Sequence, residues 1–331
     1  MMAHAHDVLG IGNAIVDVLA RVDEGFITRH GVPKGSMRLI EEPEALALYA
    51  DMGPAIEVSG GSAANTIAGL AALGGKAAFI GRVKNDQLGE LFAHDIRAGG
   101  VAYATPAAEN GPATARCYVL VTPDGERTMN TYLGASVEFS AADIDSDLIK
   151  ASAITYLEGY LWDRPQAKQA FVTAAQIARK AGGQVALTLS DRFCVDRHRD
   201  SFLQLIRDEV DILFANESEI TALYQTHDFA EAMRQAKADC RLAALTRSEQ
   251  GSVIVSGDEV HNVPAHPVDA VVDTTGSGDL YAAGFLFGLT HKRSLVDCAR
   301  LGSLAAAEVI GHLGARPQAD LKILARQAGL L

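Results

Sequence analysis

Strand-like and helix-like segments alternate along almost the whole chain of 331 residues. This alternation favours α/β layers around a largely parallel sheet, because parallel strands need a long crossover between them, usually a helix. No low-complexity linker, internal repeat or change of composition divides the chain. We therefore expect one domain over residues 1–331.

The hydrophobic pattern also predicts where the individual elements lie. Strands are expected at residues 7–12, 14–22, 77–80, 115–122, 127–133, 154–157, 184–189, 212–215, 242–246 and 252–256. Helices are expected at 62–73, with Ser62 as the N-cap, and at 87–97, 166–181, 279–289 and 295–310. Pro123-Asp124-Gly125-Glu126 is typical of a turn, so the two strands beside it are expected to form a hairpin in a small separate sheet.

The charge of the chain restricts its partners. Its 41 acidic and 29 basic side chains give a formal net charge of −12. Such a surface repels phosphate backbones and anionic lipids, so we expect no nucleic acid and no membrane as partners. The sequence shows no signal-peptide pattern and no apolar run near the roughly 20 residues of a spanning helix. Its four cysteines lack metal-ligand spacing. We expect a cytoplasmic protein with reduced thiols.

The segment Asp273-Thr274-Thr275-Gly276-Ser277-Gly278-Asp279 stands directly before an apolar helix pattern. Its glycines allow a tight turn, so backbone N–H groups can converge at the positive end of the helix dipole and form an anion site. An acidic side chain beside an anion site is explained if Asp279 is a general base that takes a proton from a hydroxyl. The alternative is that Asp279 is only a favourable acidic residue in a first helical turn.

Two earlier segments have the character of a substrate site. In Gly60-Gly61-Ser62-Ala63-Ala64-Asn65, the glycine pair lets the backbone approach a ligand, and Asn65 offers a donor and an acceptor. The alternative is a capped helix whose small residues serve packing. Asp17 stands on an apolar strand, where two neighbouring sugar hydroxyls would satisfy its carboxylate. The alternative is an edge strand on which Asp17 faces water.

A further acidic segment, Asn216-Glu217-Ser218-Glu219, follows an apolar strand. Polar side chains just past the carboxyl ends of parallel strands lie where α/β folds bind ligands. Glu219 is suited to hold a hydrated magnesium ion, which keeps several of its waters. The alternative is an ordinary helix start.

The order and spacing of these segments resemble the ribokinase (PfkB) family of carbohydrate and nucleoside kinases. DTTGSGD is similar to the family signature DTxGAGD, with Ser277 where Ala is commoner; GGSAAN is similar to the substrate-side motif, and NESE to the NxxE element. The resemblance runs from about Leu9 to Leu313. Within the family it is greatest to the adenosine kinases, in GNAIVDVLARVD, TARCYVLV, MNTYLGA, LTLSDRFC and VDILFANESE.

The resemblance implies a ribokinase-like three-layer α/β/α domain with a mostly parallel central sheet and a small β-sheet lid, whose strands come from about 13–42 and 113–134. It implies ATP and Mg²⁺ as cofactors, and it leaves open a monovalent cation such as K⁺ near Asp273 and Thr275. The family often has Thr-x-Gly-x-x-Gly at the ATP site, whereas this chain has Ser248 at the middle glycine. Whether the protein is a monomer or a homodimer stays open.

The resemblance also implies roles for individual residues. Asp279 would deprotonate the primary hydroxyl of the acceptor, and the N–H groups of Gly276, Ser277 and Gly278 would form the anion hole. The acceptor site would contain Asn13, Asp17, Gly60, Gly61 and Asn65, with Leu133 and Phe193 beside the nucleobase of the acceptor. The ATP site would contain Asn216, Thr246, Gly251, Thr275, Gly276 and Gly278, and magnesium would lie near Asn216 and Glu219.

These roles predict ATP-dependent phosphorylation of the 5′-hydroxyl of adenosine to give AMP, a step of purine salvage. A carboxylate with an ordinary pKa of about 4 is too weak to ionise an alcohol beforehand, so proton removal must accompany the attack. The lid would exclude water that competes for the phosphoryl group. The alternatives are a kinase for ribose, fructose or a related sugar, and a nucleotide-binding sensor without catalysis.

Overall fold

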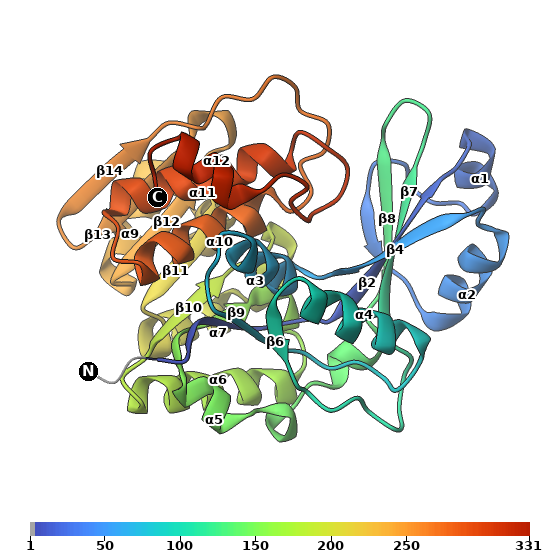
Figure 1. Cartoon of the computed structure of the whole chain (residues 1–331), viewed down its shortest axis with the longest axis horizontal. Helices are drawn as coiled ribbons and strands as arrows, with labels where there is room; N and C mark the ends of the chain where they lie inside the picture. Colours follow the sequence, from blue (N-terminus) through green and yellow to red (C-terminus); the bar gives the residue numbers. More distant parts are fainter. Residues whose placement is uncertain (1–3) are drawn as a thin grey trace.

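A nine-stranded sheet forms the centre of the large body in the computed structural model, which describes residues 4–331 (Figure 1). From β12 to β6 in the order below, each strand runs parallel to the next one. The strand β13 runs antiparallel to β12, and β14 runs antiparallel to β13. In spatial order the strands are β14 (Glu259–Val263), β13 (Ser252–Ser256), β12 (Leu242–Thr246), β11 (Ile212–Asn216), β10 (Gln184–Thr188), β9 (Ser152–Glu158), β1 (His6–Ile11), β5 (Ala77–Ile80) and β6 (Val101–Tyr103).

Helices cover both faces of this sheet. Successive side chains of a strand point to opposite faces, and accordingly Val8 joins one hydrophobic core while Leu9 joins the other. On the Val8 side lie α3 (Ser62–Ala72), α4 (Gln87–Ala98), α10 (Ser277–Thr290), α11 (Leu295–Val309) and α12 (Leu321–Gln327). On the Leu9 side lie α5 (Ser146–Lys150), α6 (Pro165–Lys180), α7 (Arg192–Glu209), α8 (Glu217–Leu223) and α9 (Phe229–Asp239). The predicted three-layer α/β/α architecture is confirmed.

A second sheet of five strands stands beside the body (Figure 1). Its strands in spatial order are β3 (Met37–Leu39), β8 (Arg127–Tyr132), β7 (Ala115–Val121), β2 (Ile15–Arg21) and β4 (Ala55–Gly60). The helices α1 (Glu24–Arg29) and α2 (Glu42–Asp51) cover one face, where Phe26 and Leu48 share a core with Val18 of β2. The opposite face carries Asp17 and is less covered, since Ile56 on that face is 71% exposed.

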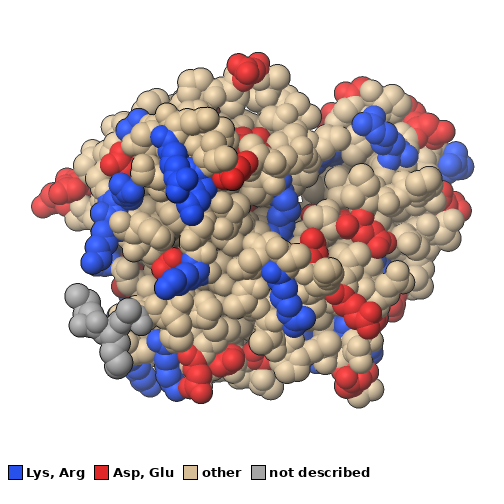
Figure 2. Space-filling model, viewed as in Figure 1, with Lys and Arg blue, Asp and Glu red and all other residues tan. Residues whose placement is uncertain are grey.

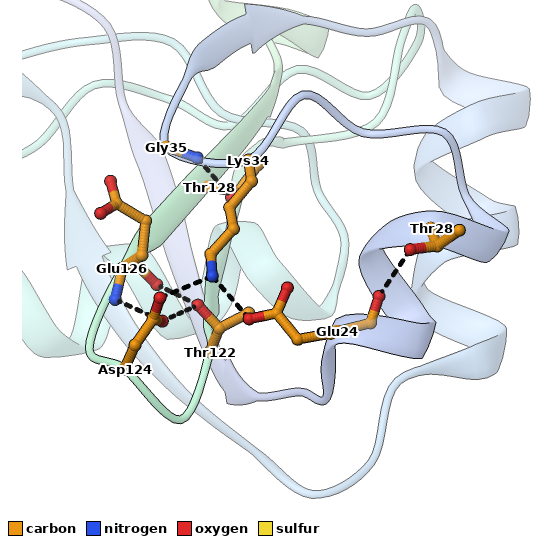
Figure 3. Close-up of polar contacts among 8 residues, drawn as sticks. All are labelled: Glu24, Thr28, Lys34, Gly35, Thr122, Asp124, Glu126 and Thr128. Atoms are coloured by element: carbon orange, nitrogen blue, oxygen red, sulfur yellow. Dashed lines mark hydrogen bonds and ion pairs between the residues drawn. The ribbon is translucent and has the colours of Figure 1, made fainter.

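The hairpin of β7 and β8 is antiparallel, as predicted. Its turn is held by Lys34, which donates to Asp124 at 2.6 Å and to Glu24 at 2.5 Å (Figure 3). The ammonium group of Lys34 holds the pKa of the Asp124 carboxyl well below its usual range. The hydroxyl of Thr122 also donates to Asp124, at 2.7 Å. These contacts fix the tip of the hairpin, although all of them lie near the surface.

Most predicted strands and helices are present with bounds that shift by one or two residues. The N-cap prediction for Ser62 is wrong: Gly61 is the N-cap of α3, and Ser62 is its first residue. The sequence also gave no sign of β3 and β6, because three residues are too few to show an alternation. The strand β4 joins the small sheet from outside the two ranges expected for lid strands.

Charged side chains of both signs are interspersed on the face shown in Figure 2, and the surface is hollowed where the small sheet meets the body. No helix in residues 4–331 combines the length and apolar character required to span a bilayer.

Candidate active site

The segment before α10 presents free backbone N–H groups. Gly276 is the N-cap of α10 with a left-handed φ of 78°, and a Cβ there would lie 2.6 Å from the Cβ of Ala315. The N–H of Ser277 donates to the carbonyl of Thr274 at 3.2 Å, which closes the turn. Within the described chain, the N–H groups of Gly276, Gly278 and Asp279 have no acceptor. The start of this 14-residue helix can therefore receive an anion.

The carboxylate of Asp279 is held by α3. Its Oδ1 accepts from the hydroxyl of Ser62 at 2.6 Å, and its Oδ2 accepts from Nδ2 of Asn65 at 3.1 Å. Burial raises the pKa of Asp279, while these two hydrogen bonds and the charge of Arg316 lower it. Ser62 was expected to cap a helix and Asn65 to bind sugar; in the structure both orient Asp279.

Asp17 lies on β2 between β7 and β4, so the edge-strand alternative is wrong. A Cβ at Gly60 would collide with its carboxylate, so this glycine is needed where the two strands meet. Burial raises the pKa of Asp17 to about 7; Arg316 lowers this pKa and the charge of Asp279 raises it. The carboxylate of Asp279 is therefore near enough to Asp17 for its charge to act there.

Glu158 is a member of this cluster that sequence reasoning missed. It ends β9, is 1% exposed, and accepts hydrogen bonds from the backbone N–H of Asn13 at 3.2 Å and from its Nδ2 at 2.6 Å. It also accepts from the N–H of Ala63 at 2.8 Å, and a Cβ at Gly61 would collide with the carbonyl of Asn13. Burial raises the pKa of Glu158 to about 7. An acidic residue closing an apolar strand was the available signal.

Arg127 connects the small sheet to the loop before α10. Its guanidinium forms an ion pair with Asp273, and its Nε and Nη2 have no partner among the described residues. Asp273 also accepts from the N–H of Thr275 at 3.0 Å and of Gly314 at 3.1 Å. A K⁺ ion would have to displace Arg127 to reach this carboxylate, so the potassium site stays a prediction.

Two of the predicted ATP-site residues, Asn216 and Thr246, lie at the carboxyl ends of β11 and β12, where they pair with each other. Gly251 lies in the loop after β12, and Thr275, Gly276 and Gly278 lie at the start of α10. Asn216 and Glu219 form a capping box: the N–H of Asn216 donates to Oε2 of Glu219 at 3.0 Å, and the N–H of Glu219 donates to Oδ1 of Asn216 at 2.8 Å. Nδ2 of Asn216 also donates to Oε1 of Glu219, at 2.5 Å. Burial raises the pKa of Glu219 to about 7. The alternative of an ordinary helix start is therefore true of this segment, and the magnesium role of Asn216 and Glu219 stays a prediction.

The loop after β12 contains two left-handed residues. Gly251 has a φ of 86°, and a Cβ there would collide with the carbonyl of Val263. Ser248 has a φ of 49°, a conformation that costs a residue with a side chain about 1–2 kcal/mol. The missing family glycine is thus replaced by a serine in the backbone conformation that favours glycine.

A groove of about 550 Å³ opens beside the loop before α10. It is lined by the loop 266–270 and by α11 and α12, including Val268, Leu304 and Ala307. The N–H groups of Val272 and Asp273 both donate to the carbonyl of Ile310, which anchors the loop to the end of α11. Sequence reasoning missed this groove because its walls come from segments that are far apart in the chain.

Leu133 and Phe193, the two residues predicted to flank the nucleobase, lie in different parts of the molecule. Leu133 follows β8 of the small sheet and is partly buried, whereas Phe193 lies in the first turn of α7 and is 59% exposed. The guanidinium of Arg197 lies 4.4 Å from the centroid of the Phe193 ring. Within residues 4–331, no group of three or more His, Cys, Asp or Glu side chains is arranged to hold a metal ion.

An anion-binding helix start, an acidic side chain oriented beside it and a second sheet over the cleft are features of a small-molecule kinase. Residues 56–321 match the model of the pfkB family carbohydrate kinases. The chain belongs to this family, and it is a phosphotransferase with an alcohol group as acceptor. Membership implies ATP as phosphoryl donor and a nucleoside or sugar as acceptor.

Individual relatives include kinases of both substrate classes. A crystal structure of adenosine kinase from Sinorhizobium meliloti is 55% identical with a TM-score of 0.91, covering 98% of this chain and 99% of that chain. A probable sugar kinase from Rhizobium etli CFN 42 is 52% identical with a TM-score of 0.93, covering 99% and 100%. Probable fructokinase-6 of Arabidopsis thaliana is 30% identical over 72% of this chain and 64% of its own length. Adenosine kinase of Saccharomyces cerevisiae is 26% identical over 92% and 94%.

Proposed function

We propose that this protein is an adenosine kinase that transfers the γ-phosphoryl group of ATP to the 5′-hydroxyl of adenosine. The observation that carries the chemistry is the Asp279 carboxylate, which α3 orients beside the free N–H groups at the start of α10. The 55% identity to the Sinorhizobium meliloti adenosine kinase supports adenosine as the acceptor. AMP and ADP are the products, which would place the enzyme in purine salvage.

Asp17 and the glycine pair would bind the ribose. The Asp17 carboxylate can accept hydrogen bonds from the 2′- and 3′-hydroxyls, and the absence of a Cβ at Gly60 and Gly61 lets this carboxylate and the carbonyl of Asn13 lie close to this glycine pair. Asn13, fixed by Glu158, lies against Gly61 on the same side. This arrangement would direct the 5′-hydroxyl towards Asp279.

Asp279 would act as the general base. The bond between O5′ and the γ-phosphorus forms as the bond from the γ-phosphorus to the β–γ bridging oxygen breaks, ADP leaves, and the hydroxyl proton passes to Asp279. Burial raises the pKa of Asp279, which makes its carboxylate a better base than an exposed one. Ser62 and Asn65 keep it oriented while it is ionised.

The N–H groups at the start of α10 would stabilise the charge that develops on the transferred group. Ser277 was among the residues expected to supply them, but its N–H is engaged by Thr274. We therefore assign this role to Gly276, Gly278 and Asp279. A bound Mg²⁺ would neutralise charge on the triphosphate, with Glu219 and Asn216 holding its water ligands.

The chain would work as one kinase domain in which the small sheet is a lid. Its open face carries Asp17, and Arg127 reaches from β8 to the loop before α10. The lid would exclude water from the reaction, and the guanidinium of Arg127 would bring positive charge to the loop before α10. Leu133 and Phe193 would flank the base, and the groove beside Leu304 and Ala307 would receive the nucleoside of ATP.

A sugar kinase is the second candidate, since the Rhizobium etli relative is described as a probable sugar kinase. The two are separated by measuring ADP formation from MgATP with adenosine, ribose and fructose in parallel. We expect kcat/KM for adenosine to exceed that for either sugar by 100-fold or more, about 2.7 kcal/mol of discrimination. A preference for a sugar would refute the adenosine assignment. If no acceptor is phosphorylated, the result would favour the third alternative, a nucleotide-binding sensor without catalysis.

A further inference from the structure

Arg316 lies in the segment between α11 and α12. Its side chain contacts the chain on both sides of Gly60 and Gly61. Its Nε donates to the carbonyl of Ser59 and its Nη2 to the hydroxyl of Ser59, both at 3.0 Å. Its Nη1 donates to the carbonyl of Ala64, also at 3.0 Å. Ser59 comes directly before Gly60 and Gly61, and Ala64 follows them in the first turn of α3. One guanidinium therefore bridges the two ends of this corner.

A second element fixes the corner from another side. The N–H of Ser59 donates to Oδ2 of Asp95 in α4 at 2.8 Å. The donor and the acceptor groups of the Ser59 backbone are thus both satisfied by side chains that are distant in the sequence. Glycine backbones have the greatest conformational freedom, so Gly60 and Gly61 depend on such outside contacts to keep one geometry.

Arg316 also supplies charge to the acceptor site. The negative charges of Asp95 on α4, Asp17 on β2 and Asp279 on α10 act on it, while its three hydrogen bonds go to Ser59 and Ala64. Burial lowers the pKa of Arg316 to about 10, so it remains a cation at neutral pH. Its charge lowers the pKa of both Asp17 and Asp279.

The other groups that face Asp279 are acidic or neutral. Ser62 and Asn65 of α3 donate hydrogen bonds to it. Asp17, Glu158 and Glu219 all have pKa values that the charge of Asp279 raises, as does Tyr156 of β9. Arg316 is the cation that opposes this accumulation of negative charge at Asp279.

We propose that Arg316 is a positioning residue of the phosphoryl-transfer site, which clamps the Gly60–Gly61 corner and places a fixed positive charge behind Asp17 and Asp279. This inference rests on the proposed function. A planar guanidinium is suited to the task, because it holds three acceptors at once and stays charged when buried. Lysine would keep the charge but would not span the corner.

The test compares Arg316→Gln, which loses the charge, with Arg316→Lys, which keeps it. The measurement is kcat/KM for adenosine as a function of pH at saturating MgATP. The titration of ATP is the same for all variants, so it cannot cause a difference between them. In Arg316→Gln we expect the fall of kcat/KM at low pH, the acid limb of the profile, to begin about one pH unit higher than in the wild type. At pH values below this limb, kcat/KM should therefore be about tenfold lower than in the wild type. Arg316→Lys should keep the wild-type limb but lose kcat. Arg199→Gln is the matched control, because Arg199 donates to the carbonyl of Leu223 at 2.9 Å in another part of the body.

An acid limb that stays at the wild-type pH in Arg316→Gln overturns the proposal, since a purely structural arginine would lower stability without moving the limb. A limb that moves in Arg316→Lys overturns it as well, and this variant serves if Arg316→Gln does not fold. Adenosine binding without ATP gives a readout that does not depend on Asp279 as base: loss of the charge should shift the titration of Asp17 to higher pH. If that shift occurs while Asp279→Asn keeps full turnover, the proposed base is refuted and the placement of Arg316 stands.

Discussion

Replacing Asp279 by Asn tests the proposed chemistry most directly. The variant keeps the shape of the side chain but removes its basicity, and loss of a general base lowers kcat by about 10²- to 10⁴-fold. This corresponds to about 2.7–5.5 kcal/mol in activation free energy. The amide oxygen can accept from Asn65 while the amide NH2 donates to the hydroxyl oxygen of Ser62, so at most one hydrogen bond, about 1 kcal/mol of stability, is lost. Because a buried charge is removed at the same time, the melting temperature should change little.

Adenosine binding gives the second readout for Asp279→Asn. The charge of Asp279 helps to raise the pKa of Asp17 to about 7, so its removal lowers that pKa. Ionised Asp17 is the form that accepts hydrogen bonds from the ribose, and adenosine should therefore bind at lower pH in the variant than in the wild type. Isothermal titration between pH 5.5 and 8 measures this shift, and steady-state ADP release measures kcat.

The matched control is Asp297→Asn. Asp297 is also an acidic residue in a first helical turn, and its carboxylate accepts from the hydroxyl of Ser294 at 2.8 Å. It represents the alternative in which Asp279 only stabilises its helix, and its replacement should leave kcat unchanged. A near-normal kcat in Asp279→Asn, or equal effects of the two substitutions, would remove Asp279 from the mechanism.

Three further predictions concern the surroundings of the site. Burial raises the pKa of Glu158 from 4.5 to about 7, so the stabilisation from its protonated form is present below pH 4.5 and is lost as the pH rises through 7. The free energy of unfolding in urea should therefore fall by about 3 kcal/mol over this pH range, and Glu158→Gln should remove this fall. Ser248→Gly relieves a left-handed backbone and should stabilise the protein by about 0.5–1 kcal/mol; an unchanged or lower melting temperature would argue against strain at this residue. Gly61→Ala places a Cβ against the carbonyl of Asn13 and should cost about 1–3 kcal/mol and raise KM for adenosine; a KM like that of the wild type would show that this corner does not shape the acceptor site.

The layers of the fold could be predicted because short apolar runs alternate with longer helix-like segments along the chain. The strands β5 and β12 are visible as short apolar runs, α10 as a long apolar segment and α6 as an amphipathic one. The glycine segments before α3 and α10 were also recognisable, since their residues act locally through the backbone. The sequence placed Ser62 one position wrong, because Gly61, with a φ of 95°, takes the capping position.

The partners of each site residue could not be predicted. Asp279 meets Ser62 across a separation of 217 residues, and Arg316 meets Ser59 across 257. The sequence around Arg127 and Arg316 does not show which residues they meet. Their partners Asp273 and Ser59 come from distant segments, which only the packing of the whole chain brings to them.

The accumulation of carboxylates in the cleft has a consequence for catalysis. Asp17, Glu158 and Asp279 all have pKa values that burial raises. Their ionised forms therefore destabilise the folded protein, as is common for buried carboxylates at functional sites. In the proposed site, a triphosphate at the start of α10 would add negative charge beside Asp279 and raise the pKa of Asp279 further, whereas the charge of Arg316 lowers this pKa. The base would therefore become strongest when the phosphoryl group that the hydroxyl attacks is in place. The free N–H groups of α10 and the cation of Arg127 then offset the charge of the nucleotide itself, so that the same electrostatics that strengthens the base does not expel its substrate.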